Sequence, residues 1–154
     1  MPHNLHVVLI EPEIPSNTGS IGRACLATGT TLHLVEPLGF EINDARLKRA
    51  GLDYWKHLKV TRHKSEEHFF ASIPEDAPKV FFSKKADSIY FDCRFEKSSY
   101  LIFGKETAGL PEDMLRRFSG NVYRIPQYDD RVRSLNLANA VTLAIYEAIR
   151  QLGP

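Results

Sequence analysis

Three stretches of this chain combine small residues with polar side chains that could bind a ligand. The first, residues 17–23, begins with an asparagine, contains two glycines and ends at Arg23. Backbone N–H groups left free at a helix start bind anions, and a guanidinium can bind phosphate through two hydrogen bonds. The same residues also fit an ordinary helix start with a solvated Arg23. A dinucleotide-binding fingerprint is excluded because the GxGxxG pattern is absent.

The second stretch, residues 101–111, runs from an apolar segment into a short polar loop between two glycines. Gly104, at the expected tip of a strand, would let a flat ligand approach the backbone closely. Glu106 could accept hydrogen bonds from a ligand or brace the loop. Gly109 equally fits an ordinary strand–turn–helix connection, so this stretch alone leaves both interpretations open.

The third stretch, residues 125–140, leads from Ile125 through a charged loop to a serine and two asparagines. Ser134 fits a helix N-cap, with Asn136 in the first turn. A cap does not explain why Asn136 and Asn139 lie among Leu and Ala residues, since buried amides need hydrogen-bond partners. We therefore predict that this stretch contributes to a site.

The elements that must position these stretches alternate between apolar β-like runs and helical patterns. Strands are predicted at residues 5–10, 32–35, 59–61, 80–82, 100–103 and 122–125. Helices are predicted from Asn17 as N-cap to Gly29, over 45–50 after Asp44, from Ser65 onward, over 111–118 with Pro111 first, and over 136–152. This order predicts an α/β fold with a mainly parallel sheet flanked by helices. Ligands bind such sheets beyond the carboxyl ends of the strands, where the three stretches lie.

A basic segment lies between residues 46 and 64, where seven Lys or Arg residues accompany a single acid, Asp53. Tyr54 and Trp55 lie inside it, and basic residues beside aromatic ones suit phosphate contact and base stacking on unpaired RNA. The alternative is a solvated helix face with Trp55 in the core. The residues predicted to contact RNA are Arg46, Lys48, Arg49, Tyr54, Arg131 and Arg133.

Composition limits the remaining possibilities. The 154 residues suit one domain, residues 1–154, and the net charge of +1 argues against coating nucleic acid through bulk charge. Two cysteines without CxxC spacing and six histidines without an HExxH pattern indicate no metal site. The N-terminal segment has neither a signal peptide nor the length of a membrane span, so we expect a cytoplasmic protein.

Taken together, the three stretches resemble the SPOUT superfamily of RNA methyltransferases. The matching motifs, in the family's order, are Asn17-x-Gly19-x-x-x-Arg23, Phe103-Gly104-x-Glu106-x-x-Gly109-Leu110 and Ser134-Leu135-Asn136 at the start of the terminal helix. Residues 11–19 and 49–54 further resemble the small single-domain branch of the superfamily that methylates the wobble ribose of tRNA.

The resemblance implies a fold and a cofactor. The C-terminal part of the sheet, from about Leu101 to the chain end, would form a deep trefoil knot, which the general rules of chain topology do not lead one to expect. Two chains would form a homodimer with the site near the interface. S-adenosylmethionine would bind to loops near Ser83, Gly104, Gly109, Ile125 and Ser134.

The resemblance also implies a reaction, the transfer of a methyl group from the cofactor to the ribose 2′-hydroxyl of the wobble nucleotide, with no metal. Arg23 would orient the ribose-phosphate and stabilise developing negative charge, because a guanidinium does not readily lose a proton. The other site residues would be Asn17, Glu106, Asn136 and Ser134. Two alternatives stay open: a methyltransferase of this fold that acts on rRNA or another tRNA position, and an RNA-binding protein without catalysis.

Overall fold

We describe the protein from a computed structural model covering residues 2–154, with the side chains of residues 50–53 outside the description. The strands are β1 His6–Ile10, β2 Thr31–Val35, β3 Val60–His63, β4 Lys79–Phe82, β5 Ser88–Ile89, β6 Tyr100–Phe103 and β7 Val122–Arg124. The α-helices are α1 Pro15–Thr28, α2 Ala45–Gly51, α3 Glu66–Ser72, α4 Glu112–Arg117 and α5 Leu137–Leu152. Short 3-10 helices are η1 Leu52–His57, η2 Tyr90–Asp92 and η3 Ser119–Asn121.

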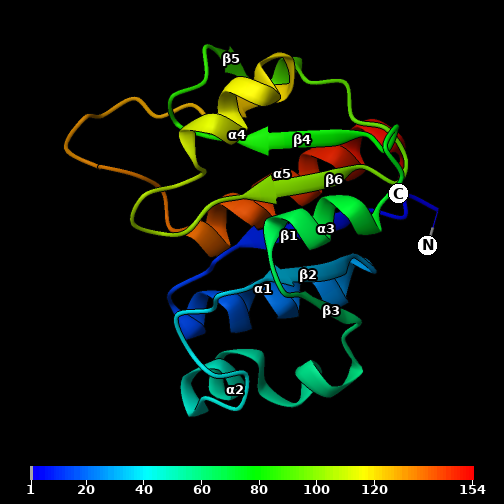
Figure 1. Cartoon of the computed structure of the whole chain (residues 1–154), viewed down its shortest axis with the longest axis vertical. Helices are drawn as coiled ribbons and strands as arrows, with labels where there is room; N and C mark the ends of the chain where they lie inside the picture. Colours follow the sequence, from blue (N-terminus) through cyan, green and yellow to red (C-terminus); the bar gives the residue numbers. More distant parts are fainter. Residues whose placement is uncertain (1) are drawn as a thin grey trace.

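The strands of the described chain form one parallel sheet in the order β3-β2-β1-β6-β4-β7-β5 (Figure 1). On the central strand β1, Val7 lies beside Leu32 of β2 and Leu101 of β6. All four residues of β6 are buried, as expected for a strand covered on both faces. The prediction of an α/β fold with a parallel sheet is therefore confirmed.

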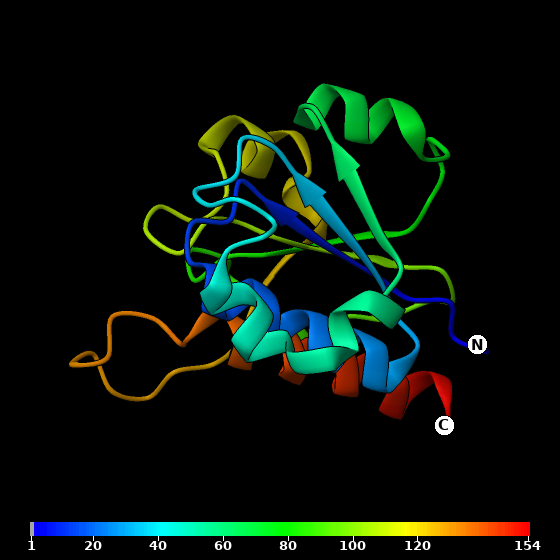
Figure 2. The ribbon, with the colours of Figure 1, turned by 90° about the horizontal axis from the view of Figure 1, so that it is seen from below.

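Helices cover both faces of the sheet, with α1, α2 and α5 on one side and α3 and α4 on the other (Figure 2). The alternation of side chains along β1 explains the two cores. Val7 and Leu9 pack in the cluster with α1 and α5, whereas Val8 and Ile10 pack in the cluster with α3 and α4. Both faces of the central strands are therefore apolar.

Three predicted helix starts are wrong by one to three residues, and two of these errors matter for the site. Helix α1 begins at Pro15, because the fixed φ of proline and its missing N–H suit the first helical position. Asn17 therefore lies in the first turn and does not cap the helix. The cap of α5 is Asn136, whose side chain accepts a hydrogen bond from the Asn139 N–H (3.2 Å), so Ser134 lies in the preceding loop. Pro111 similarly precedes α4 instead of opening it.

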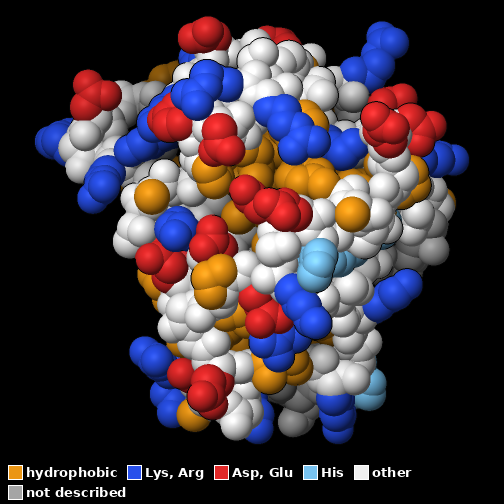
Figure 3. All heavy atoms as spheres, in the orientation of Figure 1, with side chains coloured by type: hydrophobic (Ala, Val, Ile, Leu, Met, Phe, Trp, Pro, Cys, Tyr) orange, Lys and Arg blue, Asp and Glu red, His pale blue; other side chains and the backbone are white. Residues whose placement is uncertain are grey.

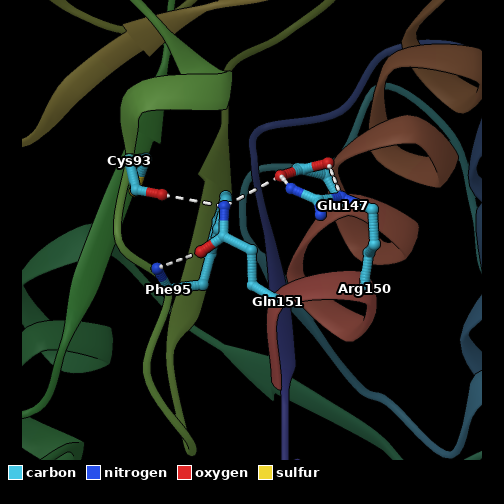
Figure 4. A network of polar contacts seen from close by, with 5 residues as sticks. All are labelled: Cys93, Phe95, Glu147, Arg150 and Gln151. Carbon is cyan, nitrogen blue, oxygen red and sulfur yellow. Dashed lines mark hydrogen bonds and ion pairs between the residues drawn. The ribbon is translucent and has the colours of Figure 1, made fainter. Parts of the chain in front are cut away.

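The C-terminal end of α5 is fastened to the segment between η2 and β6 (Figure 4). The Gln151 amide donates to the Cys93 carbonyl (3.0 Å) and accepts from the Phe95 N–H (3.0 Å). The same amide donates to Glu147 Oε2 (2.8 Å), and Arg150 binds both oxygens of that carboxylate. These bonds to Arg150 lower the pKa of Glu147. The last helix is thus held at both its start and its end.

Three histidines form a hydrogen-bonded row across β1, β2 and β3 on the α3 side. His6 Nδ1 lies 2.9 Å from His33 Nε2, and His33 Nδ1 lies 3.0 Å from His63 Nε2. The rings stack with Tyr100 on one side and meet the edge of Phe69 on the other. Burial lowers the pKa of all three imidazoles, and that of His33 to about 3. The folded protein therefore holds the row neutral.

Acidification should destabilise the protein through this row. Unfolded histidine binds a proton near pH 6.5, whereas folded His33 excludes it until about pH 3, so the stabilisation is complete above pH 6.5 and is lost as the pH falls toward 3. Each excluded proton lowers the free energy of unfolding by about 1.4 kcal/mol per pH unit in that window. Urea unfolding between pH 7 and pH 5 measures the slope, which His33→Leu should reduce and the exposed control His57→Gln should leave unchanged. A flat profile would contradict the neutral row.

Candidate active site

A cavity of about 560 Å³ lies beyond the carboxyl ends of β4, β6 and β7, at the end of the sheet from which the 125–136 loop protrudes (Figure 1). This volume suits a small-molecule ligand. Three loops line it, residues 83–85, 104–110 and 125–137, together with Asn17 from α1. The predicted site residues that line it are Asn17, Ser83, Gly104, Glu106, Gly109, Ile125, Arg133, Ser134 and Asn136. All three stretches singled out in the sequence therefore meet at one place.

Glu106 connects the β6 loop to the start of α1. Its Oε1 accepts a hydrogen bond from the Glu13 N–H (2.8 Å), and its Oε2 accepts from the Ile14 N–H (3.0 Å) and the Asn17 amide (3.2 Å). Two of these donors are backbone groups at the start of α1, which carries the positive end of the helix dipole. Of the two roles open to Glu106, the structure therefore displays the loop brace.

Asn17 continues the connection to the start of α5. Its Oδ1 accepts a hydrogen bond from the Asn136 amide at 3.0 Å, while its own amide donates to Glu106. Asn17 is buried, so these two bonds satisfy polar atoms that would otherwise be costly. The start of α1 and the start of α5 are thereby held in fixed relation to the β6 loop.

Glu13 supplies a second connection in the opposite direction, which the sequence did not reveal. Its Oε1 accepts from the Thr107 N–H (3.0 Å) and the Thr107 hydroxyl (2.7 Å). These hydrogen bonds lower the pKa of the Glu13 carboxyl. Glu13 lies between two prolines in the segment Glu11–Pro15, and nothing in that pattern indicates a partner more than ninety residues away.

Replacing Glu106 with glutamine should loosen this arrangement. A glutamine amide presents N–H groups where the carboxylate accepts from three N–H donors, so at least one donor loses its partner. Leaving a partly buried donor unsatisfied costs up to about 1–3 kcal/mol, which should appear as a lower melting temperature. Thermal unfolding of Glu106→Gln measures this, with the exposed Glu96→Gln as the matched control. Equal melting temperatures for the two variants would contradict the brace.

The packing of its own loop requires a glycine at position 104. A Cβ at this position would lie 2.0 Å from the carbonyl carbon of Gly109 and 2.2 Å from the Leu110 nitrogen. The loop's own backbone therefore makes a close approach at Gly104. Gly109 has φ +71°, which favours glycine, and its N–H bonds to the Lys105 carbonyl (2.9 Å). The two glycines together fold the loop into a tight turn beside the cavity.

The remaining cavity wall combines apolar side chains with exposed polar ones. Phe103, Leu110 and Ile125 supply apolar surface from the sheet end. Ser83 follows β4, where its N–H bonds to the Tyr123 carbonyl (3.0 Å) and its hydroxyl accepts from the Lys85 N–H (3.2 Å). Ser134 lies on the exposed rim. A cavity whose wall combines apolar and polar groups suits a cofactor with an aromatic base and a polar tail.

Arg23 does not line this cavity. It is exposed on α1, and its guanidinium carbon lies 5.3 Å from the centroid of the Tyr54 ring in η1. Tyr54 is 42% exposed, whereas Trp55 packs against the core. The two aromatic residues of the basic segment therefore have different environments, and the core interpretation holds for Trp55 alone.

The predicted RNA-contacting cations lie in two separate places. Arg46, Lys48 and Arg49 are exposed on α2, where Arg46 pairs with Asp44 (3.1 Å). Arg131 and Arg133 lie on the 125–136 loop, which also carries Asp129 and Asp130, and Figure 3 shows basic and acidic side chains side by side at this end of the molecule. Arg131 forms an ion pair there with Asp129 (2.6 Å). Of the two arginines, Arg133 lines the cavity and Arg131 does not.

Within residues 2–154, outside the undescribed side chains, no cluster of three His, Cys, Asp or Glu residues is arranged to hold a metal ion. No helix of the described chain has the length and apolar character needed to cross a membrane.

A parallel sheet with a cavity beyond the carboxyl ends of its strands is the arrangement in which open α/β proteins bind small-molecule ligands. The chain matches the SpoU rRNA Methylase family over residues 4–146 and belongs to that family.

Several named proteins are similar to this chain over nearly its whole length. A tRNA (cytidine(34)-2′-O)-methyltransferase of Saccharophagus degradans is 46% identical over 151 residues, which cover 96% of each chain. A solved structure described as giving insights into the 2-OH methylation of C/U34 on tRNA has a TM-score of 0.94 and 47% identity, covering 99% of this chain and 98% of the other. An AdoMet-bound rRNA methyltransferase from Sinorhizobium meliloti has a TM-score of 0.86 and 28% identity, covering 98% of this chain and 57% of the other.

Proposed function

We propose that this protein transfers a methyl group from S-adenosylmethionine to the ribose 2′-hydroxyl of nucleotide 34, a cytidine or modified uridine, in the tRNA anticodon loop. The observation that carries the proposal is the meeting of the three motif stretches at one cavity, joined by Glu106, Asn17 and Asn136. Near full-length likeness to enzymes named for that reaction supports the substrate. On this proposal the protein works in the cytoplasm, where tRNA is modified.

The cavity fits S-adenosylmethionine in size and in the chemistry of its wall. Its volume of about 560 Å³ lies in the range of small-molecule sites, and Gly104 and Gly109 line it together with the apolar residues Phe103, Leu110 and Ile125. Ser83, Gly104, Gly109, Ile125 and Ser134 would hold the cofactor. When bound, it supplies a methyl group already activated on a sulfonium, so the protein need only align the acceptor and assist proton removal.

Arg23 is assigned to the acceptor side of the reaction. A guanidinium binds a ribose-phosphate through directed hydrogen bonds and stabilises negative charge as the 2′-oxygen loses its proton. Arg23 lies outside the cavity of its own chain, however. We therefore infer that it acts in the cavity of a second copy, so that each site is completed across a dimer. Ser134, on the exposed rim, would assist by hydrogen bonding to the acceptor.

An exposed face of α5 supports the homodimer. Leu143 is 44% exposed and Tyr146 is 53% exposed, one turn apart on the outer side of the helix. Helix α5 packs beside α1, which carries Arg23, so this apolar face and the guanidinium lie on neighbouring helices. A two-fold axis through the region would bury the apolar face against itself.

The dimer should dissociate when a charge is placed on that face. Tyr146→Lys introduces an ammonium into a self-complementary contact, where two copies of it would repel each other. Sedimentation equilibrium should give twice the chain mass for the native protein and a shift toward the monomer for the variant. Phe91→Lys, at an equally exposed aromatic residue on η2, should stay dimeric. A monomeric native protein would exclude the shared site.

We also propose the C-terminal knot. Strand β7 lies beyond β4, whereas α5, which follows it, packs beside α1 on the other side of β6, and its end is bound to residues 93–95. After β7 the chain therefore returns past β4 and β6 and ends beside the segment that joins those two strands. Stretching the unfolded chain by its ends tests this, because a tightened knot leaves the contour shorter than about 3.3–3.6 Å per residue.

The substrate assignment is tested with an anticodon stem-loop. The enzyme should methylate an RNA stem-loop with cytidine at position 34 and fail on the same stem-loop with 2′-deoxycytidine there. Affinity should fall steeply with salt if exposed cations contact phosphates. Equal methylation of both stem-loops would place the reaction at another nucleotide and contradict the proposal.

A further inference from the structure

The position of Tyr54 beside Arg23 depends on Gly22, the residue that precedes Arg23 on α1. A Cβ at Gly22 would lie 2.5 Å from Trp55 Cζ3 and 3.0 Å from Leu58 Cδ2, so only a glycine lets η1 approach α1 this closely. Trp55 is partly buried against the core and fixes η1 there. This docking brings the neighbouring Tyr54 over the guanidinium.

The contact between Tyr54 and Arg23 has the geometry of a cation–π interaction. The guanidinium carbon lies 5.3 Å from the ring centroid, within the distance at which the negative face of an aromatic ring attracts a cation. An exposed arginine otherwise samples many rotamers, and ordering its side chain has an entropic cost. A ring on a docked segment reduces the number of conformations of the guanidinium, while Arg23 stays exposed to a ligand.

We propose that Tyr54 is a positioning residue that holds Arg23 in the orientation required by the acceptor ribose-phosphate. The inference rests on the proposed function, because it gives Arg23 the role assigned there. It replaces the simpler interpretation of Tyr54 as a surface on which an RNA base stacks. The aromatic ring supplies the interaction, so the tyrosine hydroxyl is dispensable.

Variants at position 54 separate these interpretations. Tyr54→Leu should lower kcat about fivefold, the effect of losing one exposed cation–π contact, while the KM for tRNA and the Kd for S-adenosylmethionine stay unchanged. Tyr54→Phe, which keeps the aromatic ring, should retain the native kcat. A tetrafluorinated phenylalanine at position 54 has nearly the same shape without the negative ring face and should behave like leucine. In labelled protein, the Arg23 Nε–Hε resonance should shift when the ring is removed.

Two controls keep the result interpretable. Trp55 is the only tryptophan, so unchanged emission shows that η1 remains docked. The fluorinated variant decides the matter if Tyr54→Leu perturbs that emission. Unchanged kcat with the fluorinated ring, or a loss of tRNA affinity with native kcat at saturation, would overturn the positioning role. Full activity of Arg23→Ala would instead overturn the proposed function of Arg23 itself.

Discussion

We expect Arg23→Ala to lower the rate of methyl transfer to tRNA by about two to three orders of magnitude while S-adenosylmethionine binds with native affinity. The expected separation follows from the structure, because Arg23 is exposed on α1 and does not line the cavity assigned to the cofactor. Loss of one charged group that stabilises a developing oxyanion typically lowers kcat by about 10²–10³-fold. Single-turnover methylation measures the rate, and calorimetry measures cofactor binding. Turnover at the native rate would remove Arg23 from the mechanism.

The same variant tests whether the site is shared between two chains. Arg23→Ala can be mixed and refolded with a chain whose own cavity is damaged but which retains Arg23. A mixed dimer then contains one complete site, in which the cavity of one chain meets Arg23 of the other. Activity should reappear in the mixture although each variant alone is inactive. An inactive mixture that contains mixed dimers would show that Arg23 serves its own chain.

Gly104→Ala should destroy the cofactor site. The added methyl group would lie 2.0 Å from the Gly109 carbonyl carbon, and backbone atoms at that distance must move. Overpacking of this kind costs about 1–3 kcal/mol or more, and the displaced loop lines the cavity. We expect at least a tenfold weaker affinity for S-adenosylmethionine, measured by calorimetry, and a lower melting temperature.

Gly120→Ala is the matched control for this substitution. Gly120 has no atom within 4 Å of the position a Cβ would occupy, so the change should be tolerated. The Gly104→Ala variant, whose own cavity is damaged, also serves as the partner of Arg23→Ala in the mixing experiment. Native cofactor affinity in Gly104→Ala would contradict the tight turn at the cavity.

Most strands of the sheet could be predicted from the sequence, because a short, nearly continuous apolar run is enough to indicate a buried strand. The nearly continuous apolar run at residues 5–10 indicates a strand buried on both faces, and β1 is such a strand. Strand β5 was missed because two residues, Ser88 and Ile89, are too few to display a pattern. The segment 52–57 was likewise not recognised as a 3-10 helix, which places Tyr54 over Arg23.

The sequence predicted which residues line the cavity, but not the hydrogen bonds that join them. Motif order placed Asn17, Glu106 and Asn136 together, yet their mutual hydrogen bonds depend on helix starts that differ from the predicted ones by two or three residues. Helix α1 begins at Pro15, so the Asn17 side chain does not cap the helix and instead donates to Glu106. The Glu13–Thr107 pair is a long-range contact and has no local signal.

The most direct test of the account is transfer of labelled methyl groups from S-adenosylmethionine to total tRNA that lacks its native wobble methylation, followed by nuclease mapping. Ribose methylation blocks cleavage at the modified nucleotide. The account predicts label in a nuclease-resistant dinucleotide from the anticodon loop. Label elsewhere in tRNA, or none while the cofactor binds, would contradict it and favour another RNA substrate or a role in binding alone.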